Sequence, residues 1–453
     1  MIAPMFRRGD LPSPERLRVR ATAKMKLLRD SVRWLVGADG IQSGWRTGLV
    51  LLAVSAALIV LRAPGLLIHP RLWAEEGLLY LPTSFTLPWW KALLAVQNGY
   101  FSLLPNLATV LAARVFPLAW AAWVTTLFAF LLQLVPVAIV GFGRSTFWPT
   151  NLQRMLVVVA LLFSWNSGEV WLNTINGQFW CLSICFLILL TDYQMTSRRQ
   201  HVLFCIALFL CGLNGVVSAF LLPLFIARAI VERNPRIVKQ TLALGAASLL
   251  QSVAVWLAFA AGAATGRLAG GQSQRFLEFV LVRGVLRGFV APETAWGLMP
   301  HKYWVTLLLA LAAVFLATRV GWRGLAFLVG GFLLTAVLSL VFAVRQAPAP
   351  RYLFVPSVML LVLLTTNIDW PLPRPSWLQA ARCLLAAGAL VLFFRQTVPQ
   401  YRSAMADFTN PAWPHWSAEV QKWQQDQRYH PKIHPCWDGK CWEVVLAATS
   451  RPR

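Results

Sequence analysis

Residues 48–68, GLVLLAVSAALIVLRAPGLLI, form the first long apolar run of the chain and indicate its fold class. About 20 mainly apolar residues are enough for a helix to cross the roughly 30 Å hydrocarbon core of a bilayer. Similar runs recur along a chain of 453 residues that is 58% hydrophobic, 13% charged and has a mean hydropathy of +0.59. We therefore expect an all-α polytopic membrane protein.

The segment before this run, residues 1–46, is rich in Arg and Lys. The apolar run begins too late for a cleaved signal peptide and ends at His69-Pro70, so we predict an uncleaved first span after a cytoplasmic N-terminus. Residues 47–395 would then form the transmembrane domain, with a long first exterior loop at 69–117. Residues 396–453 would form an exterior C-terminal cap.

Hydropathy predicts about eleven spans, several of them shorter than a simple crossing requires. They are expected near 48–68, 118–141, 155–165, 178–191, 202–213, 215–231, 241–262, 303–318, 324–343, 352–368 and 380–395. If the Arg-rich loops between these runs all lie in the cytoplasm, successive spans cross the membrane in alternating directions without contradiction. Either the predicted ends of the short runs are wrong, or these runs form short or broken helices beside a water-filled cavity.

The net charge of +24 is distributed over short loops between apolar runs rather than along one stripe. This distribution favours the positive-inside bias and contact with anionic membrane lipids, and argues against nucleic acid as a partner.

Acidic residues are rare in the first half of the chain. Between Asp39 and Asp192 the acids are Glu75, Glu76 and Glu169. Glu75 and Glu76 are adjacent, follow the first span closely and lie near Trp73 and Tyr80. Apolar surroundings raise the pKa of a carboxylate and let it act as a base, although a solvated loop pair is the simpler interpretation.

The order Glu75-Glu76-Gly77-Leu78-Leu79-Tyr80 after a first span, with a later Arg351-Tyr352 at the start of a span, resembles the GT-C class of membrane glycosyltransferases. The resemblance implies a polyprenyl-phosphate-linked sugar as donor, an acceptor hydroxyl on a glycan, lipid or protein, and inversion by single displacement. It implies an inner-membrane enzyme with its site on the exterior face. Glu75 or Glu76 would be the catalytic base; the family often has Asp-Glu here, which leaves the choice between them open.

Phosphate recognition is expected from exterior basic residues, because a guanidinium offers paired donors to phosphate oxygens. The candidates are Arg345, Arg351 and Tyr352, which could instead be snorkelling residues at a helix end. The amphipathic segment within 263–302 is either an interfacial helix or a wall of the donor site, with Arg283, Arg287, His301 or Lys302 near the phosphate.

Sugar binding is expected from amide and aromatic side chains, since amides both donate to and accept from hydroxyl groups. The candidates are Trp73, Asn173, Asn176, Gln178 and Glu169, and Glu169 is also a second candidate for the base. The alternative for the stretch around 166–178 is a polar turn between two short spans.

Two cysteines, Cys436 and Cys441, bracket an Asp-Gly turn signal in the expected exterior tail, where they favour a small disulfide loop. No pattern of metal-ligand spacing and no phosphate-cradling glycine loop is present in the sequence. No cofactor is assigned, although an acidic site of this kind could hold a divalent cation.

Two other functions fit the same sequence features. A flippase or transporter of lipid-linked sugars also needs many spans, but such folds often contain internal repeats, and the two halves here show no convincing one. An exterior-facing glycan polymerase or ligase would depend on exterior arginines rather than on the acidic pair.

Overall fold

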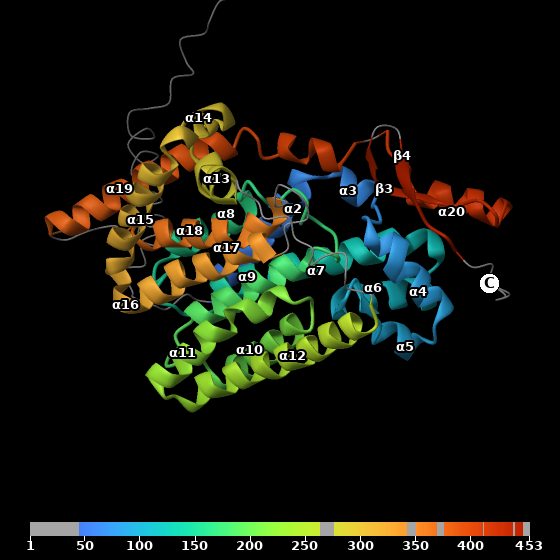
Figure 1. Cartoon of the computed structure of the whole chain (residues 1–453), viewed down its shortest axis with the longest axis horizontal. Coiled ribbons are helices and arrows are strands. Elements are labelled where there is room, and N and C mark those ends of the chain that lie inside the picture. The colour runs from blue at the N-terminus through green and yellow to red at the C-terminus, as the bar shows by residue number, and fades with distance from the viewer. Residues whose placement is uncertain are drawn as a thin grey trace, which may run out of the picture.

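The computed structural model describes residues 45–262, 276–341, 350–368, 376–410, 412–437 and 440–446. These residues form a mainly helical molecule, and their strands make two small antiparallel hairpins (Figure 1). The structure therefore agrees with the expected fold class, that of an all-α membrane protein.

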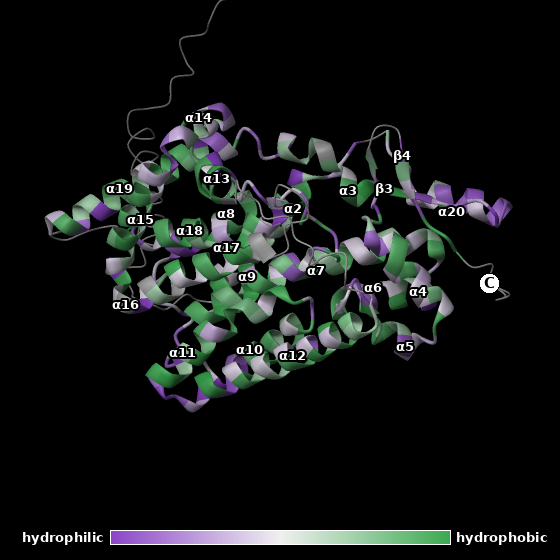
Figure 2. Cartoon of the chain, viewed as in Figure 1, coloured by the Kyte–Doolittle hydropathy of each residue, from purple (hydrophilic) through white to green (hydrophobic). Residues whose placement is uncertain are grey.

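Five helical stretches are long and apolar enough to cross a membrane. They are Trp45–Arg62, Leu118–Phe142, Pro235–Ala260, Met299–Val320 and Trp377–Thr397. The helices within them are α2 (Trp45–Arg62), α7 (Ala121–Phe142), α12 (Pro235–Ala260), α15 (Lys302–Ala317) and α19 (Trp377–Thr397). Hydrophobic residues colour most of their length in Figure 2, and many of their large apolar side chains are exposed, among them Leu308 and Leu384. Such exposed apolar faces are typical of helices that contact lipid.

The other expected spans form shorter helices. They are α8 (Asn151–Phe163), α9 (Gly177–Leu190), α10 (Arg198–Gly212), α11 (Leu222–Glu232), α17 (Gly330–Val341) and α18 (Phe354–Thr366). At 1.5 Å per residue, none of these helices alone covers about 30 Å of hydrocarbon. The number of crossings thus stays a prediction.

The core is built around α9. Every side chain from Phe179 to Leu190 is buried, and the helix packs against α7, α10 and α18. A helix that is apolar on all sides must be enclosed by protein or lipid, and here protein encloses it. The polar segment that precedes α9 is therefore anchored to a helix in the buried core.

Helices α2 and α7 approach each other through two glycines. A Cβ atom on Gly141 would lie 3.0 Å from the Cα atom of Gly48, and one on Gly48 would lie 2.3 Å from the Phe142 ring. Small residues allow such close approach between membrane helices. The start of the first span is thereby fixed against the end of α7. The span ends at Arg62, earlier than the expected 68, and α3 (Gly65–Ile68) follows Pro64 as a separate turn.

The expected first loop, 69–117, is folded throughout. Its elements are η1 (Glu76–Tyr80), α4 (Leu81–Thr86), α5 (Trp89–Leu93), β1 (Val96–Gln97), β2 (Tyr100–Phe101) and α6 (Leu103–Arg114). Trp89 and Trp90 of α5 are exposed. Gln251 of α12 anchors the loop by exchanging two hydrogen bonds with the backbone of Phe101, at 3.1 and 2.6 Å.

Short helical pieces complete the chain before its C-terminal segment. They are η2 (Leu118–Trp120), η3 (Val217–Leu221), α13 (Phe276–Phe279), η4 (Val280–Val285), η5 (Leu286–Gly288), α14 (Pro292–Gly297), η6 (Met299–His301), η7 (Thr318–Val320), α16 (Gly321–Gly324), η8 (Leu325–Val329) and η9 (Pro350–Leu353). The segment from α13 to η5 is buried along much of one side, as the amphipathic pattern predicts, but its helix type changes twice.

The C-terminal segment follows α19 and contains η10 (Ser403–Phe408), α20 (Trp416–Gln425), β3 (Lys432–Trp437) and β4 (Lys440–Glu443). Figure 1 shows it crossing the molecule from α19 to the side that carries α3 and α4. Two hydrogen bonds tie its start to α2, from Tyr401 Oη to the Leu58 carbonyl at 3.0 Å and from Arg402 Nε to the Leu61 carbonyl at 2.9 Å.

Candidate functional site

Glu76, one of the two candidate bases, is completely buried and fully engaged by the protein. Its carboxylate accepts from the Trp73 backbone N–H at 3.0 Å and from the Thr174 hydroxyl at 2.5 Å, and also from the Thr174 backbone N–H. Burial raises the pKa of Glu76, while these hydrogen bonds and Arg71 oppose the rise. Both oxygens are thus committed to joining the first loop to residues before α9.

Glu75 has a different environment. It is half-buried, precedes η1 and makes no capping hydrogen bond with its side chain. Its charge acts on Arg351. The preceding Ala74 has φ +46, a left-handed conformation that costs a non-glycine residue roughly 1–2 kcal/mol. The backbone is therefore held in an unfavourable conformation at the residue that orients Glu75.

Arg351, the main candidate for phosphate recognition, forms an ion pair with Glu169. Burial acts to lower the pKa of Arg351, but Glu169, Tyr352 and Glu75 outweigh it and the pKa is raised. The guanidinium also lies 5.2 Å from the centre of the Tyr352 ring. Residues from 75, 169 and 351 thus converge, as the hypothesis of a single site requires.

Arg71 joins this group and was not among the predicted site residues. It is buried, stacks over Trp73 at 4.2 Å, and none of its guanidinium nitrogens has a hydrogen-bond partner within the described residues. Burial lowers its pKa to about 9, against the opposing charges of Glu76 and Glu169. We call Arg71, Glu75, Glu76, Glu169 and Arg351 the charged cluster.

The predicted sugar-binding amides mostly shape the loop that carries Glu169. Asn173 and Asn176 are buried and both donate to the Glu169 carbonyl oxygen, at 2.7 and 3.0 Å. Leu172 has φ +51, a second left-handed residue beside the cluster. These contacts give both asparagines a structural role, and sugar binding by them stays a prediction.

Other predicted site residues lie elsewhere or outside the described residues. Lys302 pairs with Glu278 at 2.8 Å, and Gln178 lies against Gly215 at the turn before η3. Trp73 is buried and covers Arg71 and Phe408 rather than offering an open face. Arg345 falls in 342–349, outside the described residues.

The C-terminal segment packs directly onto the acidic pair. Trp73 forms a parallel bridge with His434, and the Ala74 backbone N–H donates to the His434 carbonyl at 2.6 Å. A Cβ atom on Gly77 would lie 2.5 Å from Ile433 Cδ1, so only glycine fits beneath the strand without displacing that side chain. The position of Glu75 and Glu76 therefore depends on β3.

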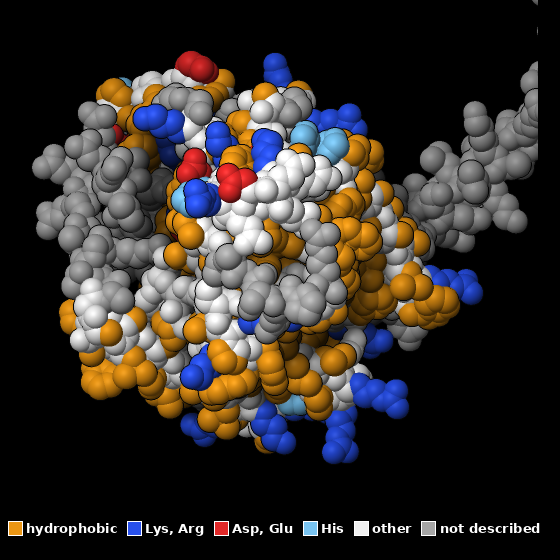
Figure 3. Space-filling model, turned by 90° about the vertical axis from the view of Figure 1, so that its right-hand side faces the viewer, with side chains coloured by type: hydrophobic (Ala, Val, Ile, Leu, Met, Phe, Trp, Pro, Cys, Tyr) orange, Lys and Arg blue, Asp and Glu red, His pale blue; other side chains and the backbone are white. Residues whose placement is uncertain are grey.

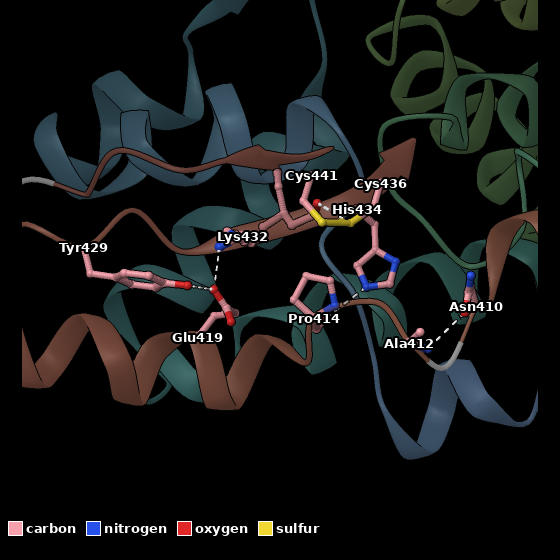
Figure 4. The surroundings of a disulfide bond; sticks show 10 residues. Asn410, Ala412, Pro414, Glu419, Tyr429, Lys432, His434, Cys436 and Cys441 are labelled. Atoms are coloured by element: carbon pink, nitrogen blue, oxygen red, sulfur yellow. Dashed lines mark hydrogen bonds between the residues drawn. A yellow bond between two sulfur atoms is a disulfide. The ribbon is translucent and has the colours of Figure 1, made fainter. Parts of the chain in front are cut away.

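Three further features hold β3 in place (Figure 4). A disulfide joins Cys436 and Cys441, the pair proposed from sequence. Glu419 of α20 accepts from Tyr429 Oη at 2.5 Å and from the Lys432 backbone N–H at 2.9 Å. His434 Nε2 donates to the Pro414 carbonyl at 3.1 Å, and burial, with Arg71 nearby, lowers the pKa of His434 to about 3.

The face formed by this segment carries mixed charge. Figure 3 shows acidic, basic and histidine side chains gathered in the upper part of the right-hand side of the molecule, with hydrophobic side chains around them. The charged cluster therefore lies beneath the C-terminal segment, whose surface carries mixed charge, and not beneath an apolar helical surface.

A divalent cation does not fit the charged cluster as it stands. Protein donors occupy both oxygens of Glu76, and Arg351 pairs with Glu169. Among the described residues, no three His, Cys, Asp or Glu side chains lie close enough together to hold a metal ion. We therefore derive no step through a metal.

Two residues of the site escaped the sequence analysis for different reasons. Arg71 follows the first span on the side that the sequence predicts to be exterior, the same signal that singled out Arg351. Thr174 gave no signal, because a lone threonine acquires its role only through tertiary contact with Glu76. Comparison of the chain with protein families, with curated proteins and with solved structures finds no match.

Proposed function

We propose that this protein is a membrane glycosyltransferase that moves a monosaccharide from a polyprenyl-phosphate donor to an acceptor hydroxyl. The single observation that carries the proposal is the convergence of Glu75, Glu169 and Arg351 from three distant segments. Such a site contains a carboxylate that could accept a proton and a cation able to stabilise an anionic leaving group.

Glu75 is the preferred base in this proposal. Glu76 is committed to Trp73 and Thr174, whereas Glu75 is half-buried and lies within electrostatic reach of Arg351. Glu75 would accept the proton of the acceptor hydroxyl as that oxygen attacks the anomeric carbon. The bond from that carbon to the phosphate oxygen breaks on the opposite face, which inverts the configuration.

Arg351 would stabilise the departing polyprenyl phosphate, where negative charge develops in the transition state. Glu169 has a positioning role, because its ion pair and the bonds from Asn173 and Asn176 to its backbone carbonyl fix the place of the guanidinium. No nucleotide is needed, since the donor is already activated on lipid.

The orientation belongs to the same proposal. About eleven membrane-embedded helices, five of them full-length, would lie in a cell inner membrane with the charged cluster on the exterior face. The basic loops near Arg199, Arg233 and Arg319 would face the cytoplasm. The disulfide of the C-terminal segment is compatible with an oxidising exterior compartment.

The test uses purified full-length protein and a panel of polyprenyl-phosphate sugars, with release of free polyprenyl phosphate as the readout. Glu75→Gln should lower turnover by roughly 100-fold or more, the usual contribution of a general base. Glu293→Gln, at an exposed position of α14, is the matched control and should leave turnover unchanged. Full turnover in Glu75→Gln would refute the assigned base.

A polymerase or ligase acting on lipid-linked glycan is the competing proposal. The buried guanidinium of Arg71, without a protein hydrogen-bond partner among the described residues, favours it, since that chemistry depends on arginines. In that case turnover of a lipid-linked oligosaccharide would survive Glu75→Gln and fail in Arg71→Gln.

A further inference from the structure

Three helices end together beside an opening that the charged cluster does not use. Their last residues are Arg62 of α2, Phe163 of α8 and Thr397 of α19 (Figure 1). The space between its walls, open solvent included, amounts to about 360 Å³, and Arg62 and Arg287 both line it. None of its lining residues is acidic.

Arg62 is the unusual member of this lining. Arg62 is 3% exposed. Its Nη1 donates to the Leu162 carbonyl at 2.9 Å and to Ser167 Oγ at 2.7 Å. Its Nε has no hydrogen-bond partner, and it forms no ion pair with any residue that the structure describes. A buried cation without a counter-ion is costly, so this position favours an anionic ligand.

The rest of the lining suits a phosphate group with an apolar attachment. Ser164 Oγ is buried without a partner and can donate a hydrogen bond. The rings of Trp165 and Tyr401 also line the opening, and Tyr401 lies 5.0 Å from the Arg62 guanidinium. Guanidinium groups bind phosphate through paired donors, while Trp and Tyr rings are typical of headgroup depth.

The depth of the opening follows from the helices that end there. Both α2 and α19 are long and apolar enough to span a bilayer, so their common end lies at a membrane–water interface. We propose that this opening, between Arg62 and Arg287, binds the phosphate group of a membrane lipid. The proposal does not rest on glycosyl transfer, because a phospholipid and a polyprenyl phosphate both carry the required group.

The site is linked to the charged cluster through one loop. Ser164 and Trp165 line the opening, while Glu169 and Thr174 of the same loop hold Arg351 and Glu76. A lipid bound at Arg62 would therefore contact the segment that positions the cluster.

Native mass spectrometry of the full-length protein in detergent tests the proposal. Three probes are titrated separately: polyprenyl phosphate, phosphatidylglycerol and inorganic phosphate. Arg287→Gln should weaken lipid binding about fivefold, the change that one basic residue near a membrane surface typically produces. Ala404→Trp, at an exposed lining position, should block the opening without removing a charge. Arg395→Gln, exposed on α19 outside the lining, is the charge-matched control and should bind as the wild type.

The three probes distinguish the source of the phosphate. Tighter binding of polyprenyl phosphate assigns the site to a donor or product lipid, and equal binding of phosphatidylglycerol assigns it to membrane phospholipid. Both outcomes support a lipid-phosphate site. Unchanged lipid binding in both Arg287→Gln and Ala404→Trp would overturn it, as would binding of inorganic phosphate alone.

Discussion

Thr174 donates two hydrogen bonds to Glu76, one from its backbone N–H and one from its hydroxyl, across 98 residues of sequence. This contact joins the first loop to the segment before α9, and it separates the roles of two adjacent glutamates. Glu76 holds the fold at this point, whereas Glu75 is the carboxylate that we propose as the base.

Removing the Glu76 carboxylate should therefore destabilise the protein. Glu76→Ala leaves the donors of Trp73 and Thr174 buried without an acceptor, and each such donor costs about 1–3 kcal/mol. We expect a loss of about 3 kcal/mol or more, measured by thermal unfolding of the detergent-solubilised protein. Glu293→Ala, at an exposed position of α14, is the control and should unfold close to the wild-type temperature. Equal unfolding temperatures for the two variants would contradict the structural role of Glu76.

The Glu169–Arg351 ion pair should appear as a coupling energy. Both side chains are partly buried, so solvent screening is incomplete. A double-mutant cycle with Glu169→Gln and Arg351→Gln should give a coupling of about 1–2 kcal/mol in unfolding free energy, within the usual range for contacting residues. Additive effects of the two substitutions would show that the pair contributes no stability.

The contact between α2 and α7 should not tolerate a side chain at Gly141. A Cβ atom there meets the backbone of Gly48 at 3.0 Å, and backbone cannot move aside as a flexible side chain can. We expect Gly141→Leu to cost at least about 2 kcal/mol, by analogy with overpacked cores. Gly388→Leu makes the same change in α19, where a Cβ would meet nothing within 4 Å, and should be tolerated. The yield of monodisperse protein and its unfolding temperature compare the two.

Acidification should loosen the C-terminal segment. Burial, together with Arg71 and His415, lowers the pKa of His434 to about 3 from an ordinary value of 6.5, against the opposing bond to Pro414. The unfolded segment takes up a proton below about pH 6.5 while the folded one does not, so stability falls as the pH falls from 6.5 towards 3. The slope is at most about 1.4 kcal/mol per pH unit.

Hydrogen exchange of the β3 backbone between pH 6.5 and 5, corrected for intrinsic rates, measures this effect. That window lies above the ordinary range of Glu419, whose pKa burial acts to raise but Lys422 and Tyr429 lower overall. His434→Gln should flatten the dependence. A slope unchanged by that substitution would assign the effect to another group.

Local sequence patterns predict much of the fold but little of the candidate functional site. The run 178–191 is apolar and bounded by polar residues, and it forms α9 at Gly177–Leu190. The end of the first span was placed too late because Arg62 lies inside an apolar run, whereas the helix stops there before Pro64. Hydropathy averages over such single residues and cannot detect where a backbone turns.

The charged cluster was partly predictable because carboxylates are scarce in this chain. Glu75, Glu169 and Arg351 were all singled out, and the structure brings them together. Which glutamate is engaged by Thr174 depends on tertiary packing, as does the insertion of His434 beside Trp73. No local pattern contains that information.

The strand that covers Gly77 also has a consequence for biosynthesis. The turn that carries Glu75 leaves the ribosome early, but Ile433 and His434, which complete its packing, follow hundreds of residues later. A nascent chain can insert all its long apolar helices and still have this turn uncovered. The site is therefore completed only after β3 has been synthesised, and loss of β3 and β4 would yield a chain that is inserted in the membrane but unfinished at its acidic turn.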